Sequence, residues 1–395
     1  MKIGIVTFVK ADNYGAELQA YALQQKLNML GYDAEVLDLE KEQGVMASSK
    51  RNIVTSLKKR IAYYGFFRGS IRFLQTIIGA LEAKKARQKN IEQALAKHAI
   101  FERFFYEKIK HTHDYIKLDE LAVKELPYDV YIAGSDQIWN YMQTKRLDVF
   151  FLMFANRFNA KKISYAASFS VPEIPEELKE QYKVYLNNLD SISVREINAV
   201  KIVEELSSRK AVQVLDPTFL LTREEWVNNL AVKHYLNLPN RLVVIYTLSG
   251  SRYIYTLAKD IAKRLTADVV NIKSGYNRVK EDSGIIHITD AGPQEFITLF
   301  SKAVYVITDS FHGTAFSINF NIPFTSLLNP VSNINSRVLS ILQQCKLQDR
   351  IIYDDGSKSR PNTLDFSFKM ANEVISDARE FSLSYINKSL SENYD

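Results

Sequence analysis

The chain alternates short apolar runs with amphipathic segments, and this alternation limits its possible folds more than any other feature. Runs such as "KIGIVTF", "YDVYIAGS" and "RLVVIYTL" are rich in β-branched residues and end at turn residues, as buried strands do. Segments with helical periodicity follow them, for example residues 14–31 and 253–265. Parallel strands need such helical crossovers. The pattern therefore predicts an α/β protein with doubly wound parallel sheets.

Two such series follow one another, and 395 residues are enough for two domains with sizeable cores. We expect an N-terminal domain over residues 1–210, interrupted by a basic helical insertion at about 50–110, and a C-terminal domain over 211–364. A helix within 365–395 should pack back on one of them. In such folds ligands bind in a cleft at the carboxyl ends of the strands.

The composition is that of an ordinary globular protein, with 46 % hydrophobic and 24 % charged residues. A single cysteine, Cys345, excludes an internal disulfide and suits a reducing compartment. The N-terminal apolar run is too short for a secretory signal, and no window reaches the ~20 apolar residues of a membrane span. We therefore expect a soluble, cytoplasmic protein.

Positive charge is concentrated in residues 50–89, which hold eleven Lys or Arg residues and one acid, Glu82. Aromatic and aliphatic residues are interleaved with them at roughly helical spacing. Such a helix can rest on an anionic membrane surface, which predicts a peripheral membrane contact. It can equally be a solvated basic face over an ordinary core stripe. No nucleic-acid recognition motif accompanies the charge, so we expect no nucleic-acid partner.

Polar or small residues follow directly after four of the predicted strands. Because parallel strands end at the same edge of a sheet, all four segments are candidates to line one cleft. They are residues 13–16, 134–140, 193–196 and 309–314.

The segment "VYVITDSFHGTAFSINFNIPF", residues 304–324, delivers a histidine to the mouth of a helix. Asp309 and Ser310 are expected to cap that helix. Gly313 and Thr314 keep its first turn slim, so free backbone N–H groups can face an anion. A negative ligand there favours the protonated form of His312, which can then act as a general acid. The alternative is a partly buried histidine bonded to a neighbouring carbonyl.

Arg195 ends an otherwise small and apolar strand in "SVRE". A guanidinium in that place can bind a phosphate or carboxylate with two donors. An ion pair with Glu196 explains it equally well.

The loop "GSDQIWN", residues 134–140, crowds polar side chains around Trp139. Amides such as Gln137 beside an exposed aromatic ring suit sugar binding, because a sugar presents both hydroxyls and an apolar face. Asp136 could act as a base toward a sugar hydroxyl. The alternative is a structural loop held by side-chain-to-backbone bonds.

The first helix opens with "NYGAELQAYALQ". Asn13 suits its turn, and Glu17 suits the helix dipole, so structure alone accounts for both. Their position at the end of the first strand makes them candidates for the site. The histidines form no convincing metal set, His111 and His113 being the nearest approach, so we expect no metal. The chain has no GxGxxG motif, P-loop or GxSxG elbow.

In order and spacing, the chain resembles the polysaccharide pyruvyl transferase family over residues 3–352. The segments that carry the resemblance are "NYGAELQAYALQ", "AGSDQIWN", "SYAASFS", "SVRE", "VLDPTFLL", "TDSFHGTAFSINFNIPF" and "NSRVLSILQQCKLQDRII". The resemblance implies two Rossmann-like domains facing a central cleft, in a glycosyltransferase-B-like arrangement. It also implies transfer of a pyruvyl group from phosphoenolpyruvate to a sugar of a surface polysaccharide such as a capsule, usually forming a ketal. Phosphoenolpyruvate is then the donor substrate, and no cofactor is expected.

Carried over by residue, the resemblance implies that His312 protonates C3 of the donor and that Arg195 binds an anionic group. Some members have an arginine where this chain has Ser310. Arg337, or with less support Arg252, would then supply the missing cation. Acceptors assembled on lipid carriers at the cytoplasmic membrane face would give the basic stretch at 50–89 a use.

Two other functions remain open from the sequence. Two-domain α/β clefts also serve glycosyltransferases that use nucleotide sugars. A binding module for an acidic glycan, without turnover, would need the same kinds of residue.

Overall fold

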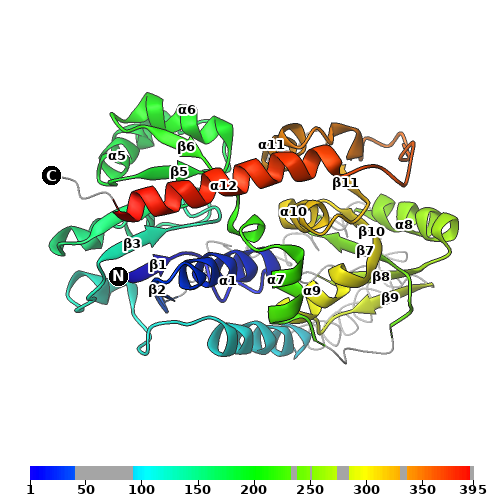
Figure 1. Cartoon of the computed structure of the whole chain (residues 1–395), viewed down its shortest axis with the longest axis horizontal. Coiled ribbons are helices and arrows are strands. Elements are labelled where there is room, and N and C mark those ends of the chain that lie inside the picture. Colours follow the sequence, from blue (N-terminus) through cyan, green and yellow to red (C-terminus); the bar gives the residue numbers. More distant parts are fainter. Residues whose placement is uncertain (41–91, 233–237, 250, 274–283, 330–335, 392–395) are drawn as a thin grey trace, which may run out of the picture.

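The computed structural model describes residues 1–40, 92–232, 238–249, 251–273, 284–329 and 336–391 (Figure 1). The basic stretch at 50–89, and with it the expected membrane contact, lies outside the described residues. Of the predicted insertion, residues 92–108 are described and form a helix. Among the described helices, none is long and apolar enough to cross a membrane.

The N-terminal half is built on a parallel sheet with the strand order β2-β1-β3-β4. The two short strands β5 and β6 continue it, because single bridges join Ile163 to Ser191 and Ala167 to Val194. The strands are β1 (Lys2–Val6), β2 (Asp33–Val36), β3 (Val130–Ala133), β4 (Lys161–Ser164), β5 (Ile192–Val194) and β6 (Ala211–Gln213). The helices are α1 (Tyr14–Met29), η1 (Leu118–Ala122), α4 (Leu147–Phe150), η2 (Met153–Arg157), α5 (Glu176–Asn187) and α6 (Ile197–Leu206).

The C-terminal half contains a six-stranded parallel sheet with the order β12-β11-β10-β7-β8-β9. Counted from β7, this is the 3-2-1-4-5-6 order of the Rossmann fold, with its switch point between β7 and β10. The strands are β7 (Leu242–Thr247), β8 (Asp268–Lys273), β9 (Ile285–Ile288), β10 (Ala303–Thr308), β11 (Phe324–Leu328) and β12 (Ile351–Tyr353). The helices are α7 (Arg223–Leu230), α8 (Arg252–Leu265), α9 (Pro293–Lys302), α10 (Phe311–Asn319), α11 (Ser336–Gln344) and η5 (Gln348–Arg350).

The chain passes between the halves after β6. Val212 pairs with Ser193 of β5, so residues 211–213 belong to the first sheet, although the sequence places them in the second series. The connection runs through η3 (Pro217–Phe219) to α7, which begins at the expected capping box of Thr222 and Glu225.

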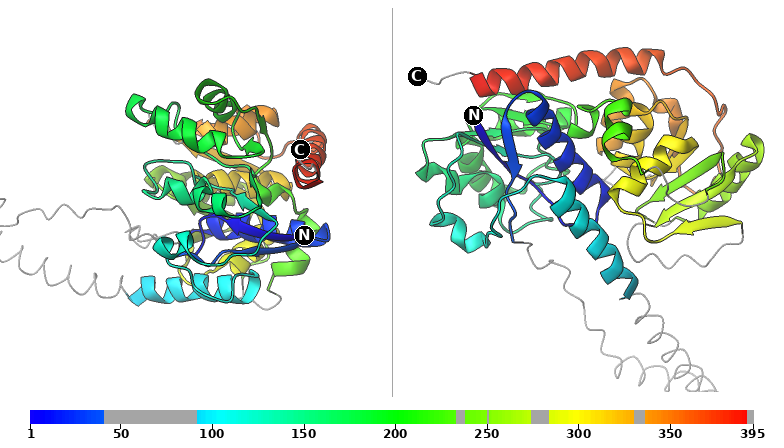
Figure 2. Two further views of the ribbon diagram at one scale, coloured as in Figure 1. Left: turned by 90° about the vertical axis from the view of Figure 1, so that its left-hand side faces the viewer. Right: turned by 60° about the horizontal axis from the view of Figure 1, so that its bottom comes forward.

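The last helix, α12 (Lys369–Ser391), lies across both halves, whereas the sequence led us to expect contact with one (Figures 1 and 2). Tyr385 donates a hydrogen bond to the Ser164 carbonyl at the end of β4. Arg379 donates to the Phe219 carbonyl in η3 and to Asn319 at the end of α10. The helix therefore ties the two sheets together.

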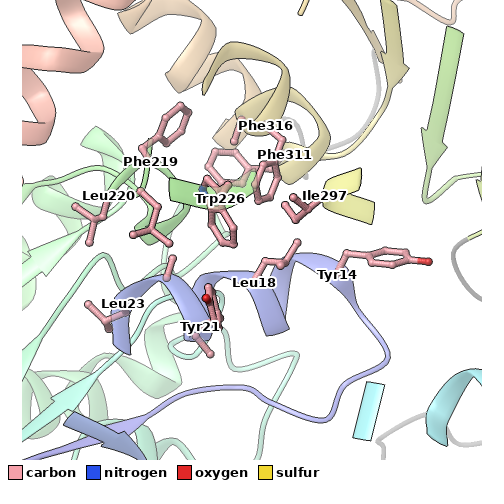
Figure 3. Close-up of a cluster of buried hydrophobic side chains, with 14 of the residues drawn as sticks. Tyr14, Leu18, Tyr21, Leu23, Phe219, Leu220, Trp226, Ile297, Phe311 and Phe316 are labelled. Atoms are coloured by element: carbon pink, nitrogen blue, oxygen red, sulfur yellow. The ribbon is translucent and has the colours of Figure 1, made fainter. Parts of the chain in front are cut away.

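Helix α1 joins the halves from inside. All but a few of its residues are buried, because one side covers the first sheet and the other meets η3, α7, α9 and α10. Figure 3 shows this junction, where Leu18 and Tyr21 of α1 lie beside Trp226 and Phe316 of the C-terminal half. Tyr14 reaches farthest, donating a hydrogen bond of 2.7 Å to the Ala291 carbonyl. The first turn of α1 is thereby fixed against the C-terminal sheet.

Candidate functional site

Helix α10 begins directly after β10, and its first turn presses against that strand. A Cβ at Gly313 would lie 2.2 Å from the Thr308 hydroxyl oxygen, so only glycine permits this approach. Thr314 is held below, its hydroxyl 2.9 Å from that of Ser326 in β11. The strand and the glycine together set the place of His312.

The His312 ring lies between the two halves of the molecule and is 6 % exposed. On one side Nε2 is 3.8 Å from Oδ2 of Asp216, an ion-pair distance, and it has no hydrogen-bond partner among the described residues. On the other side is the first turn of α1. A Cβ at Gly15 would lie 1.9 Å from Nδ1 of the histidine. The ring fits only because position 15 has no side chain.

Asp216 lies in the connection between the sheets, and its carboxylate is fully buried. Oδ1 accepts hydrogen bonds from the backbone N–H and the hydroxyl of Thr218, at 3.0 and 2.7 Å. Oδ2 accepts from Arg195 at 2.7 Å and from the Ser135 hydroxyl at 3.4 Å. Burial disfavours the charge, but His312 and Arg195 outweigh it and hold the pKa of Asp216 well below its usual range.

Arg195 follows β5 and is surrounded by carboxylates. It donates to Asp216 and, at 3.2 Å, to Glu196, and its Nη2 is 3.7 Å from Oδ1 of Asp136. Burial opposes the charge of the guanidinium, yet these three acids raise its pKa above the ordinary value. Nη2 is buried without a hydrogen bond to any described residue. The ion pair with Glu196 that the sequence left open therefore exists, and Nη2 is left with an ion pair to Asp136 but no hydrogen bond to a described residue.

Arg337 of α11 also lies near the Phe311 ring. The guanidinium carbons of Arg195 and Arg337 are 4.6 and 5.9 Å from the centre of that ring. Nε of Arg337 is buried and, within the described part of the chain, has no hydrogen-bond partner. Burial, together with the charge of Arg195, lowers the pKa of Arg337 to about 10. A small cavity between the halves is lined by both arginines with Glu196, Asp216 and Phe311.

Asp136 completes the cluster from the end of β3. Its backbone is left-handed, with φ at 74°, and the residue is 7 % exposed. Its nearest charged partner is Arg195. The carboxyl ends of β3, β5 and β10 therefore meet around one buried group of charges, as the sequence predicted for the strand ends.

Comparison with known proteins now bears on this site. A sequence model of the polysaccharide pyruvyl transferase family matches residues 13–330, which include every charged residue of the cluster except Arg337. The chain belongs to this family.

Among solved structures, the fold is similar to that of a putative UDP-N-acetylglucosamine 2-epimerase from Listeria monocytogenes. The TM-score is 0.51 at 10 % identity, covering 100 % of this chain and 97 % of that one. UDP-GlcNAc 2-epimerase from Neisseria meningitidis gives a TM-score of 0.46 at 9 % identity, covering 100 % and 95 %. No curated protein sequence matches the chain. The predicted glycosyltransferase-B-like arrangement of two Rossmann-like halves is confirmed.

Two expectations about residues of the candidate site are wrong, one about the exposure of Trp139 and one about the cap of α10. Trp139 is not exposed but fully buried, stacked on Phe151 at 4.6 Å and donating to the Phe150 carbonyl. It packs the first half and offers no platform for a sugar. Gln137 beside it is half-buried and accepts a hydrogen bond from Asn140 at 3.3 Å.

The expected cap of α10 is also absent. Ser310 occupies the N-cap position, but its side chain makes no capping bond. Asp309 turns instead to the loop after β7 and accepts hydrogen bonds from the Thr247 hydroxyl and the backbone N–H groups of Leu248 and Ser249. Asp309 thereby links the ends of β7 and β10 at the switch point of the sheet.

The candidates on α1 lie close to Gly15 but make structural contacts. Asn13 is exposed and caps the helix, accepting hydrogen bonds from the N–H groups of Gly15 and Ala16. Glu17 is fully buried and accepts from the Ala11 N–H at 3.1 Å. Burial raises the pKa of Glu17 to about 8, despite those backbone hydrogen bonds.

Sequence reasoning missed Asp216 as a member of this charged cluster. Gly15 and Glu196 lay in two of the candidate segments, but Glu196 was expected only as an ion-pair partner of Arg195, and Gly15 was given no role in the site. Asp216 stands in "VLDPTF", where the proline that follows and the cap of η3 explain an aspartate locally. The available signal was its presence in a segment that carries the family resemblance. No group of three or more potential metal ligands occurs among the described residues.

Proposed function

We propose that the protein transfers a pyruvyl group from phosphoenolpyruvate to a sugar of a surface polysaccharide or of its lipid-linked precursor, forming a ketal and releasing phosphate. The observation that supports this most is the buried His312 between Asp216 and Gly15, with Arg195 and Asp136 beside it. A proton donor in a group of fixed charges suits an enol ester, because its reaction begins with protonation of carbon.

In the proposed reaction, protonated His312 gives its proton to C3 of the donor, and C2 becomes electrophilic. A sugar hydroxyl attacks C2 and loses its proton to Asp136, which lies in the same cluster. The C2–O bond to phosphate breaks, and a second hydroxyl closes the ketal. One donor and two hydroxyls thus give one ketal and one phosphate. The proton of the second hydroxyl restores His312, and that of the first leaves Asp136 with the phosphate.

The donor carries a phosphate and a carboxylate, which need partners. Among the described residues, neither Nε of Arg337 nor Nη2 of Arg195 has a hydrogen-bond partner. Both guanidinium groups flank Phe311, the first residue of α10. The N–H groups in the first turn of this helix add donors of the kind that bind anions. Arg337 thereby replaces the cation absent at Ser310.

The proposal includes a setting as well as a reaction. The acceptor is a glycan or a lipid-linked oligosaccharide, the enzyme works in the cytoplasm, and residues 50–89 hold it against the membrane face. It needs no cofactor besides the donor substrate. Binding of the full chain to anionic vesicles, compared with a variant whose basic residues at 50–89 are neutralised, tests the membrane contact. Equal binding of the two would refute it.

The decisive experiment measures phosphate release from phosphoenolpyruvate, with and without a galactose-containing lipid-linked acceptor. We expect acceptor-dependent release that falls about 100- to 10,000-fold in His312→Ala, the range of a lost general acid. His113→Ala, which changes an exposed histidine, is the matched control and should keep its activity. Release that survives in His312→Ala would contradict the proposal. Stabilisation by a nucleotide sugar but not by phosphoenolpyruvate would favour a glycosyltransferase instead.

A further inference from the structure

The two ring nitrogens of His312 lie in different surroundings, and the difference assigns them different tasks. Nε2 faces the buried carboxylate of Asp216 at 3.8 Å. Nδ1 faces the backbone of Gly15, where no side chain intervenes. A nitrogen turned to a buried carboxylate keeps its proton, so the opposite nitrogen is the one left to exchange a proton with a ligand.

Asp216 is placed to hold this arrangement. Its Oδ1 is fixed by two hydrogen bonds from Thr218, and its Oδ2 by Arg195 and Ser135, so the carboxylate cannot turn away from the histidine. Catalytic hydrogen bonds are often long without ligand and shorten on binding. A shift of about 1 Å would turn the 3.8 Å separation into a hydrogen bond of ordinary length.

We propose that Asp216 is a positioning residue, which orients the His312 ring through Nε2 and stabilises its protonated form, so that Nδ1 is the atom that delivers the proton. This inference rests on the proposed function only for the identity of the acceptor atom, C3 of an enol ester. Transfer from Nδ1 leaves a neutral ring that still donates from Nε2–H to Asp216. Gly15 allows the ring to lie in this position, because a Cβ there would overlap the side of the ring that carries Nδ1.

Other charged residues belong to the same cluster as His312, and one of them provides a control for Asp216. Asp136 follows β3, Arg195 and Glu196 follow β5, and Arg337 lies in α11. Glu196 accepts from the same arginine as Asp216 but makes no ion pair with His312. Replacing either acid by its amide removes one of the negative charges that pair with Arg195. Only Asp216→Asn removes the group that faces Nε2. Glu196→Gln is therefore the matched control.

The first test follows the ring of His312 by NMR in the full chain with isotope-labelled histidine, with His312→Ala used to assign the signal. In Asp216→Asn we expect the pH at which this signal changes to fall by about one unit or more, the size expected when a close opposite charge is lost. In Glu196→Gln the change should be clearly smaller. Equal changes in the two variants, or none in Asp216→Asn, would overturn the proposal.

The second test is the pH profile of turnover. With Asp216→Asn, the basic limb of kcat/KM should move to lower pH by the same amount, costing about tenfold in rate per unit above the limb. A merely structural loss would lower the whole profile without moving the limb. Asp216→Glu keeps the charge, so it should keep the limb near its wild-type position while kcat falls. A moved limb in Asp216→Glu would overturn the assignment.

The two tests separate the two proposals. The NMR measurement needs no turnover, so a shift in Asp216→Asn supports the pairing even if phosphoenolpyruvate proves to be the wrong donor. Absence of phosphate release from wild type, together with that shift, would refute the proposed function alone. Where Asp216→Asn fails to fold, Asp216→Glu still decides, because it keeps the charge and should keep the limb near its wild-type position while kcat falls, and a moved limb would overturn the inference.

Discussion

The two buried arginines near the Phe311 ring differ in what surrounds them. Arg195, at the edge of the first sheet, is matched by Asp216, Glu196 and Asp136, and these acids raise its pKa. Arg337, in the C-terminal half, has a buried Nε without a hydrogen-bond partner among the described residues, and its pKa falls to about 10. Buried charges that are paired support a fold, whereas unpaired ones cost free energy and indicate a binding role. Arg195 is thus expected to stabilise the fold, whereas Arg337 is expected, under the proposed function, to bind the donor.

The largest effect on stability should come from replacing Arg195. Arg195→Met leaves Asp216 and Glu196 buried without their partner, so we expect the free energy of unfolding to fall by about 3–5 kcal/mol. Urea denaturation measures it, with Arg337→Met as the control. Equal losses in the two variants would remove the distinction between the regions.

Glu17 extends the comparison to a carboxyl group that avoids an unpaired charge by staying protonated. Its pKa rises from 4.5 to about 8, so its contribution to stability is full below pH 4.5 and is lost as the pH rises through 8. Glu17→Gln should remove this loss, and at pH 9 it should be more stable than wild type by about 5 kcal/mol. Thermal melting from pH 5 to 9 measures the difference, which should shrink toward pH 5. Parallel curves would show that Glu17 is ionised in the fold.

Gly15 tests how closely the halves must approach. Gly15→Ala places a Cβ 1.9 Å from the His312 ring, so the ring or the helix must move. We expect a loss of about 1–3 kcal/mol in stability from overpacking and of about 100-fold in turnover from misplacement. Gly31→Ala is the control, because a Cβ there meets nothing within 4 Å, although its positive φ adds some backbone strain. Full turnover in Gly15→Ala would contradict the contact.

The smallest effect on stability should come from Arg337. Arg337→Met removes a buried guanidinium whose Nε has no hydrogen-bond partner within the described part of the chain, so stability should change by less than about 1 kcal/mol. Affinity for phosphoenolpyruvate should fall about tenfold, the loss of one charged hydrogen bond. Calorimetry on wild type and variant measures this. Unchanged affinity together with lost stability would make Arg337 a structural residue.

Much of this site could be predicted from sequence, because parallel sheets bring strand ends together whatever the connections are. His312, Arg195 and Asp136 were found in this way, and the structure places them in one cluster. The alternating runs likewise predicted the parallel strands. The three-residue strand β12 and the four-residue strand β9 were not predicted.

The remainder depends on contacts between distant segments. Asp216 has a sufficient local explanation as a cap, and its second task appears only when Arg195 and His312 are placed beside it. Trp139 sits in a polar loop, yet its exposure is decided by Phe151. Asp309 was assigned to the helix after it, whereas its partners lie some 60 residues earlier. In each case local chemistry allowed two outcomes and tertiary packing selected one.

The position of His312 between the two halves has a consequence for unproductive hydrolysis of the donor. His312 belongs to α10 in one half. Its ring is in contact with Gly15 of α1 and faces Asp216 of the connection between the sheets. A molecule opened by the width of a water would lose both supports at once. Under the proposed activity, water could then reach the donor only when His312 is no longer in place to protonate it. Hydrolysis of the donor by water would be suppressed by the same docking of the halves that permits transfer to a sugar.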